Sequence, residues 1–150
     1  MTRRPGILAL LLALLLPAAA HADPAGIDLA KYRGKVVYVD FWASWCAPCK
    51  QAFPFMADLA KRHRAGGLVI LTVNEERSRT AGEAFLRQAG SSLPVIWDAD
   101  GKVARPYAVN ELPVTLIFDR KGHLRQHHQG FVDGDAERNR RVVEQLLAEH

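Results

Sequence analysis

The stretch Lys35-Val-Val-Tyr-Val-Asp-Phe-Trp-Ala-Ser-Trp-Cys-Ala-Pro-Cys-Lys50 joins a strand pattern to the start of a helix. Residues 35–42 form a near-continuous apolar and β-branched run, which is typical of a strand covered on both faces. From residue 49 to 64 apolar side chains recur at helical spacing, at Phe53, Met56, Leu59 and Ala60. Gly66-Gly67 ends that pattern. The two cysteines are therefore predicted to lie at a strand-to-helix turn.

The rest of the chain continues the alternation of strands and helices. The patterns predict strands over 68–73 and 93–97, helices over 80–89, 103–109 and 138–149, and a hairpin of strands 114–118 and 124–131. In the helix over 80–89 we expect Ala84, Phe85 and Leu86 to face inward. Strands that alternate with helices predict an α/β layered domain, and the hairpin adds an antiparallel edge that makes the central sheet mixed.

Composition excludes several classes of protein. The chain has 150 residues, of which 49% are hydrophobic, so a disordered or fibrous chain is excluded. Two cysteines are too few for a small domain stapled by disulfides. The formal net charge is only +4 and the basic residues are scattered, so we expect no binding to nucleic acid.

The first 22 residues have the three parts of a secretory signal peptide. Thr2-Arg3-Arg4 is positively charged, residues 7–16 are an unbroken apolar run, and Ala20-His21-Ala22 is a small-x-small cleavage site. We expect cleavage after Ala22 and one domain over 23–150, working outside the cytoplasm, where disulfides persist. The alternative is an uncleaved anchor, although a spanning helix needs about 20 apolar residues.

The Cys46-Ala-Pro-Cys49 motif carries the chemistry. Two intervening residues at the start of a helix bring the two sulfurs within disulfide range. The unpaired amides and the positive end of the helix dipole favour Cys46 as a thiolate. Pro48 is tolerated because first-turn amides have no helical partner. This spacing in a strand-to-helix turn is a strong indication of a redox pair.

The two cysteines have alternative uses besides a redox pair. A purely structural disulfide would close almost no loop and would stabilise little. A zinc site with His123 and His127 is excluded, since residues four apart on a strand lie about 13 Å apart. Copper held by Cys46, Cys49 and one histidine remains an alternative. His127-His128 are otherwise expected to be surface residues.

These motifs resemble the thioredoxin superfamily. Val39-Asp-Phe-Trp-Ala43 followed by Trp45-Cys-Ala-Pro-Cys-Lys50 is similar to its active-site strand and helix, and Pro54 matches the proline within that helix. Glu111-Leu-Pro-Val-Thr115 resembles its cis-proline loop, with Pro113 as the cis residue. The extra strand and helix over 93–109, together with the secretory leader, resemble the TlpA/ResA-like periplasmic branch.

The resemblance implies a thioredoxin fold, with a strand-helix insertion before the cis-proline loop, and roles for individual residues. Cys46 would attack a substrate disulfide and Cys49 would resolve the mixed disulfide. Asp40 would lie beneath the pair as the acid/base for Cys49; the alternative is a solvated carboxylate at the end of a strand. Because Val39 and Phe41 flank Asp40, we expect burial and a raised pKa.

The same resemblance implies how a substrate would bind. Pro113 would leave a backbone edge free to pair with the substrate chain, next to Leu112, and Trp45 would cover the site. An acid after the second strand, Glu75 or Glu76, could match an acid near the site in ResA-like proteins. We expect instead that both are solvated loop residues.

The implied activity is reduction of disulfides in exported proteins, in cytochrome c or copper-centre maturation or in general repair. Ala47-Pro48 between the cysteines is similar to the reducing branches. A membrane thiol donor would return electrons to the pair, and the resemblance implies a periplasmic monomer with no cofactor and no metal. The alternatives are a disulfide-donating oxidase and a copper(I)-binding chaperone, both using the same cysteines.

Overall fold

The computed structural model describes residues 26–149, so the predicted signal peptide over 1–22 lies outside the described residues. The elements follow one another as η1 Leu29–Tyr32, β1 Val36–Trp42, α1 Ala47–His63, β2 Leu68–Asn74, α2 Arg79–Ala89, β3 Val95–Trp97, η2 Arg105–Tyr107, β4 Val114–Phe118, β5 Leu124–Gln129 and α3 Asp135–Ala148. In the described part of the chain, no helix combines the length and apolar character needed to cross a membrane.

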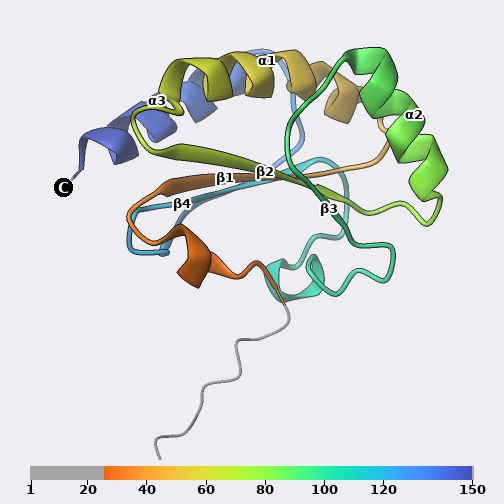
Figure 1. Ribbon diagram of the computed structural model, residues 1–150, viewed down its shortest axis with the longest axis horizontal. Helices are drawn as coiled ribbons and strands as arrows, with labels where there is room; N and C mark the ends of the chain where they lie inside the picture. Colours follow the sequence, from red (N-terminus) through yellow and green to blue (C-terminus); the bar gives the residue numbers. More distant parts are fainter. Residues whose placement is uncertain (1–25, 150) are drawn as a thin grey trace, which may run out of the picture.

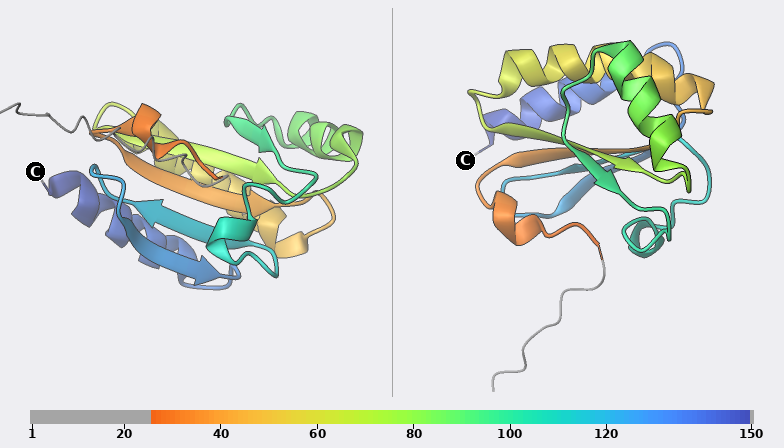
Figure 2. Two further views of the ribbon diagram at one scale, coloured as in Figure 1. Left: turned by 90° about the horizontal axis from the view of Figure 1, so that it is seen from below. Right: turned by 45° about the vertical axis from the view of Figure 1, so that its right-hand side comes forward.

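The five strands form one mixed sheet in the order β3-β2-β1-β4-β5. Strand β1 pairs in parallel with β2 and antiparallel with β4, β3 is parallel to β2, and β4–β5 is the antiparallel hairpin. Helices α1 and α3 cover one face of the sheet (Figure 1), and η1 and η2 lie over the opposite face (Figure 2). This arrangement confirms the predicted fold class.

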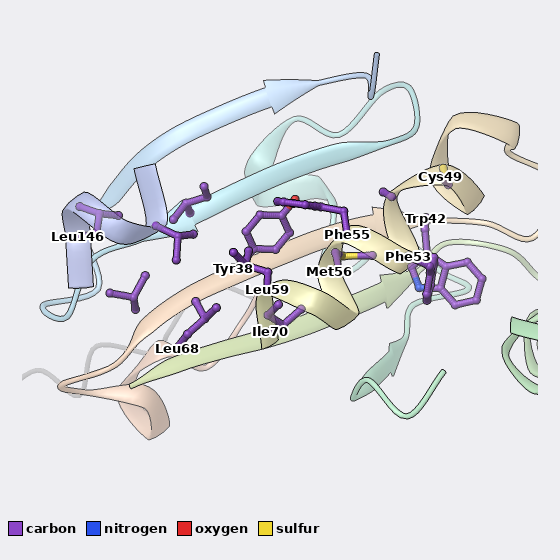
Figure 3. Packing of buried hydrophobic residues seen from close by; sticks show 14 of the residues in the cluster. Tyr38, Trp42, Cys49, Phe53, Phe55, Met56, Leu59, Leu68, Ile70 and Leu146 are labelled. Atoms are coloured by element: carbon purple, nitrogen blue, oxygen red, sulfur yellow. The ribbon is translucent and has the colours of Figure 1, made fainter. Parts of the chain in front are cut away.

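Strand β1 is buried along its whole length because apolar layers cover both of its faces. Tyr38 and Trp42 pack under the helices with residues of α1, whereas Val37, Val39 and Phe41 pack on the other side. We call the buried side chains between the sheet and helices α1 and α3 the helix-side cluster. Cys49 and Trp42 lie at the same end of this cluster (Figure 3). The period of two along a strand places Asp40 on this helix side, between Tyr38 and Trp42.

The predicted helix over 103–109 is wrong in type and length. Only a 3-10 turn, Arg105–Tyr107, forms there, and Ala108 ends it in the left-handed conformation with φ 53°. The carboxylate of Asp98 instead accepts the amides of Val103 and Ala104, both at 2.9 Å. Pro106 has no amide hydrogen to extend a helical ladder.

The expected inward face of α2 is partly wrong. Ala84 is exposed, Phe85 and Leu86 are half-buried, and Gly82 is the buried residue. A Cβ atom at Gly82 would lie 2.7 Å from the Trp97 ring, so only glycine lets α2 approach β3 this closely. Helix α3 begins at Asp135, three residues earlier than expected, where the Asp135 carboxylate accepts the Val132 amide.

Candidate active site

Cys46 and Cys49 are joined by a disulfide at the start of α1. The Cα atoms are 5.3 Å apart and the sulfurs 2.02 Å apart. Cys46 occupies the N-cap position, and its Sγ atom accepts the backbone amide of Cys49 at 3.3 Å. Pro48 lies in the first turn of the helix. The helix N-terminus therefore presents an amide donor to the Cys46 sulfur, which stabilises a thiolate there.

The two cysteines differ in their surroundings. Cys49 is fully buried within the helix-side cluster, whereas Cys46 retains 5% exposure. Trp45, just before Cys46, is 71% exposed and is one of the few large apolar side chains on the described surface. Cys46 is thus the sulfur nearer to solvent, beside an exposed aromatic ring.

Asp40 is fully buried on β1, as expected from its apolar neighbours. Across the sheet it is flanked by Thr72 of β2 and Thr115 of β4. The Thr115 hydroxyl donates to Asp40 Oδ2 at 3.0 Å, and Oδ1 has no hydrogen-bond partner among residues 26–149. Burial raises the pKa of Asp40 to about 7, although the Thr115 hydrogen bond opposes that rise. Asp40 can therefore gain or lose a proton near neutral pH.

The cis-proline loop lies at the same end of the sheet as the disulfide. The Leu112–Pro113 peptide bond is cis, and the Pro113 carbonyl accepts the Gly130 amide at 2.8 Å. Because β4 runs antiparallel to β1, Val114 at its start pairs with Phe41 near the end of β1. Leu112 is half-buried and packs against the cores on both faces.

Glu76 is not the solvated loop acid that we expected. It is 8% exposed, and its two carboxylate oxygens accept the backbone amide and the hydroxyl of Ser44, two residues before Cys46. The Asn74 side-chain amide also donates to it, at 3.0 Å. The sequence offers one indication of this role: Glu76 closely follows β2, and the end of a parallel strand lies beside the end of its neighbour.

Glu75 is also not a solvated loop acid, and it faces a different neighbour. Its backbone amide donates to the Trp42 carbonyl at 3.0 Å, which extends the β1–β2 pairing. Its half-buried carboxyl lies beside Asp98, and Oε1 has no partner among the described residues. Burial, followed by the charge of Asp98, raises the pKa of Glu75 to about 8.

His123 and His127, which the sequence offered as zinc ligands, and the neighbouring His128 all have protein partners. His123 Nδ1 lies 3.4 Å from the Asp119 carboxylate. His127 Nε2 lies 3.0 Å from the Tyr107 carbonyl, and His128 Nε2 lies 3.0 Å from the Asp135 carboxylate. His128 is half-buried and not fully at the surface as expected. Between residues 26 and 149, no three histidine, cysteine or acidic side chains are grouped so that they could hold a metal ion.

The chain is similar in sequence to proteins named as thiol-disulfide oxidoreductases. The thiol-disulfide oxidoreductase ResA of Bacillus subtilis is 38% identical over 98 residues, which are 65% of this chain and 55% of ResA. ResA of Geobacillus kaustophilus is 35% identical over 98 residues, 65% of this chain and 56% of that protein. The chain therefore spans about half the length of these curated relatives.

A solved structure extends the similarity over most of both chains. A Chlorobium tepidum protein assigned to the DsbE thiol:disulfide interchange proteins is 34% identical, with a TM-score of 0.77. The alignment covers 80% of this chain and 85% of that chain. A model of the AhpC/TSA family matches residues 16–127. With its mixed five-stranded sheet and the Cys46–Cys49 pair at the start of α1, this chain belongs to the AhpC/TSA family of the thioredoxin superfamily.

Proposed function

We propose that this protein is a thiol-disulfide oxidoreductase that reduces disulfides of exported proteins through Cys46 and Cys49. One observation carries the proposal: the Cys46 sulfur caps a helix, where it accepts the Cys49 amide. Lowering the pKa of a thiol from about 8.5 to about 7 raises its thiolate fraction at neutral pH from a few per cent to about half. Its ResA relatives, named as thiol-disulfide oxidoreductases, support the same activity.

In the reduced protein the reaction has two exchange steps. The Cys46 thiolate attacks one sulfur of the substrate disulfide, a bond forms between Cys46 and that sulfur, and the other substrate sulfur leaves as a thiolate. Cys49 then loses its proton and attacks Cys46 Sγ, which releases the second substrate sulfur. The two released thiolates take up protons. Two electrons pass to the substrate, and the protein is left with the Cys46–Cys49 disulfide.

Asp40 is proposed as the base for the second step. Cys49 is fully buried, so its proton cannot pass directly to bulk water. Asp40 lies on the strand face beneath α1 and titrates near neutrality, which suits transfer of a proton from a thiol. The first step requires no such base, because the helix N-terminus already favours the Cys46 thiolate.

Trp45, Leu112 and Pro113 are proposed to bind the substrate chain around the disulfide. Trp45 offers an exposed aromatic surface directly beside Cys46. The Pro113 carbonyl already accepts the Gly130 amide, and β4 begins only at Val114. The backbone groups of Leu112 are therefore the ones proposed to pair with an extended peptide.

The cellular setting follows from the leader and from the direction of electron flow. We propose export to the periplasm with cleavage after Ala22. There the pair would be reduced again by a membrane thiol donor after each turnover. Maturation of cytochrome c or of copper centres would supply suitable oxidised substrates, and the protein would act as a monomer.

Mixed-disulfide trapping tests the assignment of the two cysteines. Cys49→Ser should still attack a disulfide through Cys46 and accumulate mixed disulfides, seen as gel bands that disappear on reduction. Cys46→Ser should trap nothing, since the only other thiol in the chain is buried. If Cys46→Ser traps substrate while Cys49→Ser does not, the two roles are reversed. If neither variant traps any, the proposed exchange reaction fails.

A further inference from the structure

A row of buried polar side chains runs under the helices from Asp40 to α3. Asp40 and Tyr38 on β1, Thr115 on β4 and Asn139 on α3 are each at most 1% exposed. Thr115 Oγ1 lies 3.0 Å from Asp40 Oδ2 and 3.4 Å from the Tyr38 hydroxyl, and Asn139 Nδ2 lies 3.1 Å from that hydroxyl. Three elements distant in sequence thus join one hydrogen-bonded row that ends at the carboxyl.

When Asp40 is charged, the number of hydrogens on each group fixes the direction of the row. Thr115 has one hydroxyl hydrogen, which it donates to Asp40 Oδ2. The Tyr38 hydroxyl must therefore donate to Thr115, and its own oxygen accepts from Asn139 Nδ2. Asn139 keeps its amide oriented because its Oδ1 atom accepts from Gln126 Nε2. Every hydrogen in the row points toward Asp40.

We propose that Thr115, Tyr38 and Asn139 are positioning residues that form a one-way row of donors and stabilise the charged carboxylate of Asp40. Donors aligned head to tail polarise one another, and a carboxylate accepts such a bond more strongly than a carboxylic acid does. In the reaction the row keeps the base available to Cys49 inside an apolar core. This part of the inference rests on the proposed function of Asp40.

The opposite side of Asp40 provides an internal comparison. Thr72 on β2 is its other register partner and is equally buried, yet the Thr72 hydroxyl donates to the Pro94 carbonyl at 2.9 Å. Three ionisable groups face the row: Tyr38 itself, Asp135 of α3, and Cys49 of α1 once it is reduced. The negative charge of Asp135 raises the pKa of the Tyr38 hydroxyl. Thr72 and Thr115, from the two neighbouring strands, are neutral. The row is therefore the only donor set directed at Asp40 within residues 26–149.

The direct test is a carbon-13 NMR titration of the Asp40 carboxyl in the oxidised protein, which needs no enzymatic activity. Thr115→Val should raise the titration midpoint by about one pH unit, because the charged form loses its donor. Tyr38→Phe should raise it by a smaller amount, since it removes the second donor in the row. The matched control Thr72→Val also loses a buried hydroxyl but should leave the midpoint unchanged.

A second readout links the row to the reaction. From a midpoint of about 7, Thr115→Val should slow mixed-disulfide resolution about fivefold at pH 7, and a higher pH should restore the rate. The inference is overturned if Thr115→Val leaves the carboxyl midpoint unchanged, or if Thr72→Val shifts it equally. A shifted midpoint with an unchanged resolution profile would uphold the donor row and instead overturn the proposed role of Asp40. Tyr38→Phe keeps the test decisive should Thr115→Val fold poorly.

Discussion

Asp40 on β1 and Thr115 on β4 face each other across the antiparallel pair, and the Thr115 hydroxyl donates to Asp40 Oδ2 at 3.0 Å. This contact is the only hydrogen bond to the Asp40 side chain within the described residues, and the other carboxylate oxygen has no partner. A carboxyl that is buried yet only half satisfied is poised between its two protonation states. That balance suits a group that must take up a proton from a buried thiol.

Replacing Asp40 with asparagine should separate the two exchange steps. Alkylation of the Cys46 thiolate at neutral pH should be nearly unchanged, because the helix N-terminus stabilises that thiolate. Breakdown of the mixed disulfide should be slower by roughly 10- to 1000-fold, the loss expected for a general base. Single-turnover kinetics with a disulfide substrate would follow attack and resolution separately. Equal resolution rates from pH 6 to 9 in both proteins would make Asp40 purely structural.

The same substitution should change how stability depends on pH. The folded pKa of about 7 lies above the ordinary value of 3.8, so the folded state holds more protons between those values. Stability is therefore lost as pH rises through this range. Above pH 7, the free energy of unfolding of Asp40→Asn, measured with urea, should exceed that of the wild type by about 1–3 kcal/mol. Near pH 4 the two proteins should differ little. A constant difference at every pH would contradict the buried titration.

Glu75→Gln and Glu76→Gln should have opposite effects, although the residues are adjacent. The pKa of Glu75 is raised to about 8, so Glu75 contributes a loss of stability as pH rises from about 4.5 to 8, and Glu75→Gln should remove that contribution while leaving the one due to Asp40. Glutamine at position 76 has one acceptor oxygen, whereas both oxygens of Glu76 bind Ser44. Glu76→Gln should therefore lower stability by about 1–3 kcal/mol. Urea unfolding from pH 5 to 9 measures both; matching curves would refute this distinction.

Gly82→Ala should destabilise the fold although it adds only one methyl group, at the buried position of α2. The new Cβ would overlap the Trp97 ring, at 2.7 Å, and forcing the two apart should lower the free energy of unfolding by about 1–3 kcal/mol. Gly66→Ala is the control, since its Cβ would meet only the His63 carbonyl at 3.4 Å. Thermal unfolding of both variants tests the close packing of α2 on β3. Equal melting temperatures would show that the ring moves aside freely.

Secretion should release a protein that begins at Asp23. The apolar run over 7–16 is too short to span a bilayer, and Ala20-His21-Ala22 fits a signal peptidase. The mass of protein recovered from the periplasm of a secreting bacterium should equal that of residues 23–150. Intact chain in the membrane fraction would instead support an anchor.

Local patterns predicted the parts of the fold that depend on neighbouring residues. The strand-turn-helix unit around Cys46 and Cys49 was predictable because buried runs, helical spacing and terminating glycines are all short-range features. The burial of Glu76 was missed because it depends on Ser44, which lies 32 positions earlier, in the connection between β1 and α1. Asn139 could not be linked to Tyr38, 101 residues earlier, before α3 was placed on the sheet. The raised pKa of Asp40 was predictable because it follows from burial between Val39 and Phe41. Its hydrogen bond with Thr115 depends on a contact between distant elements, which the sequence pattern does not contain.

The equilibrium reduction potential of the Cys46/Cys49 pair tests the central claim most directly. A protein that reduces its substrates must have a disulfide more stable than theirs, so the potential should lie nearer to the roughly −270 mV of thioredoxin than to the roughly −120 mV of strong oxidants. Glutathione or dithiothreitol redox buffers, with the oxidised fraction read by alkylation and mass spectrometry, provide the measurement. A value well below about −200 mV is the predicted result. A value above about −180 mV would contradict the reductase assignment and identify a disulfide donor instead.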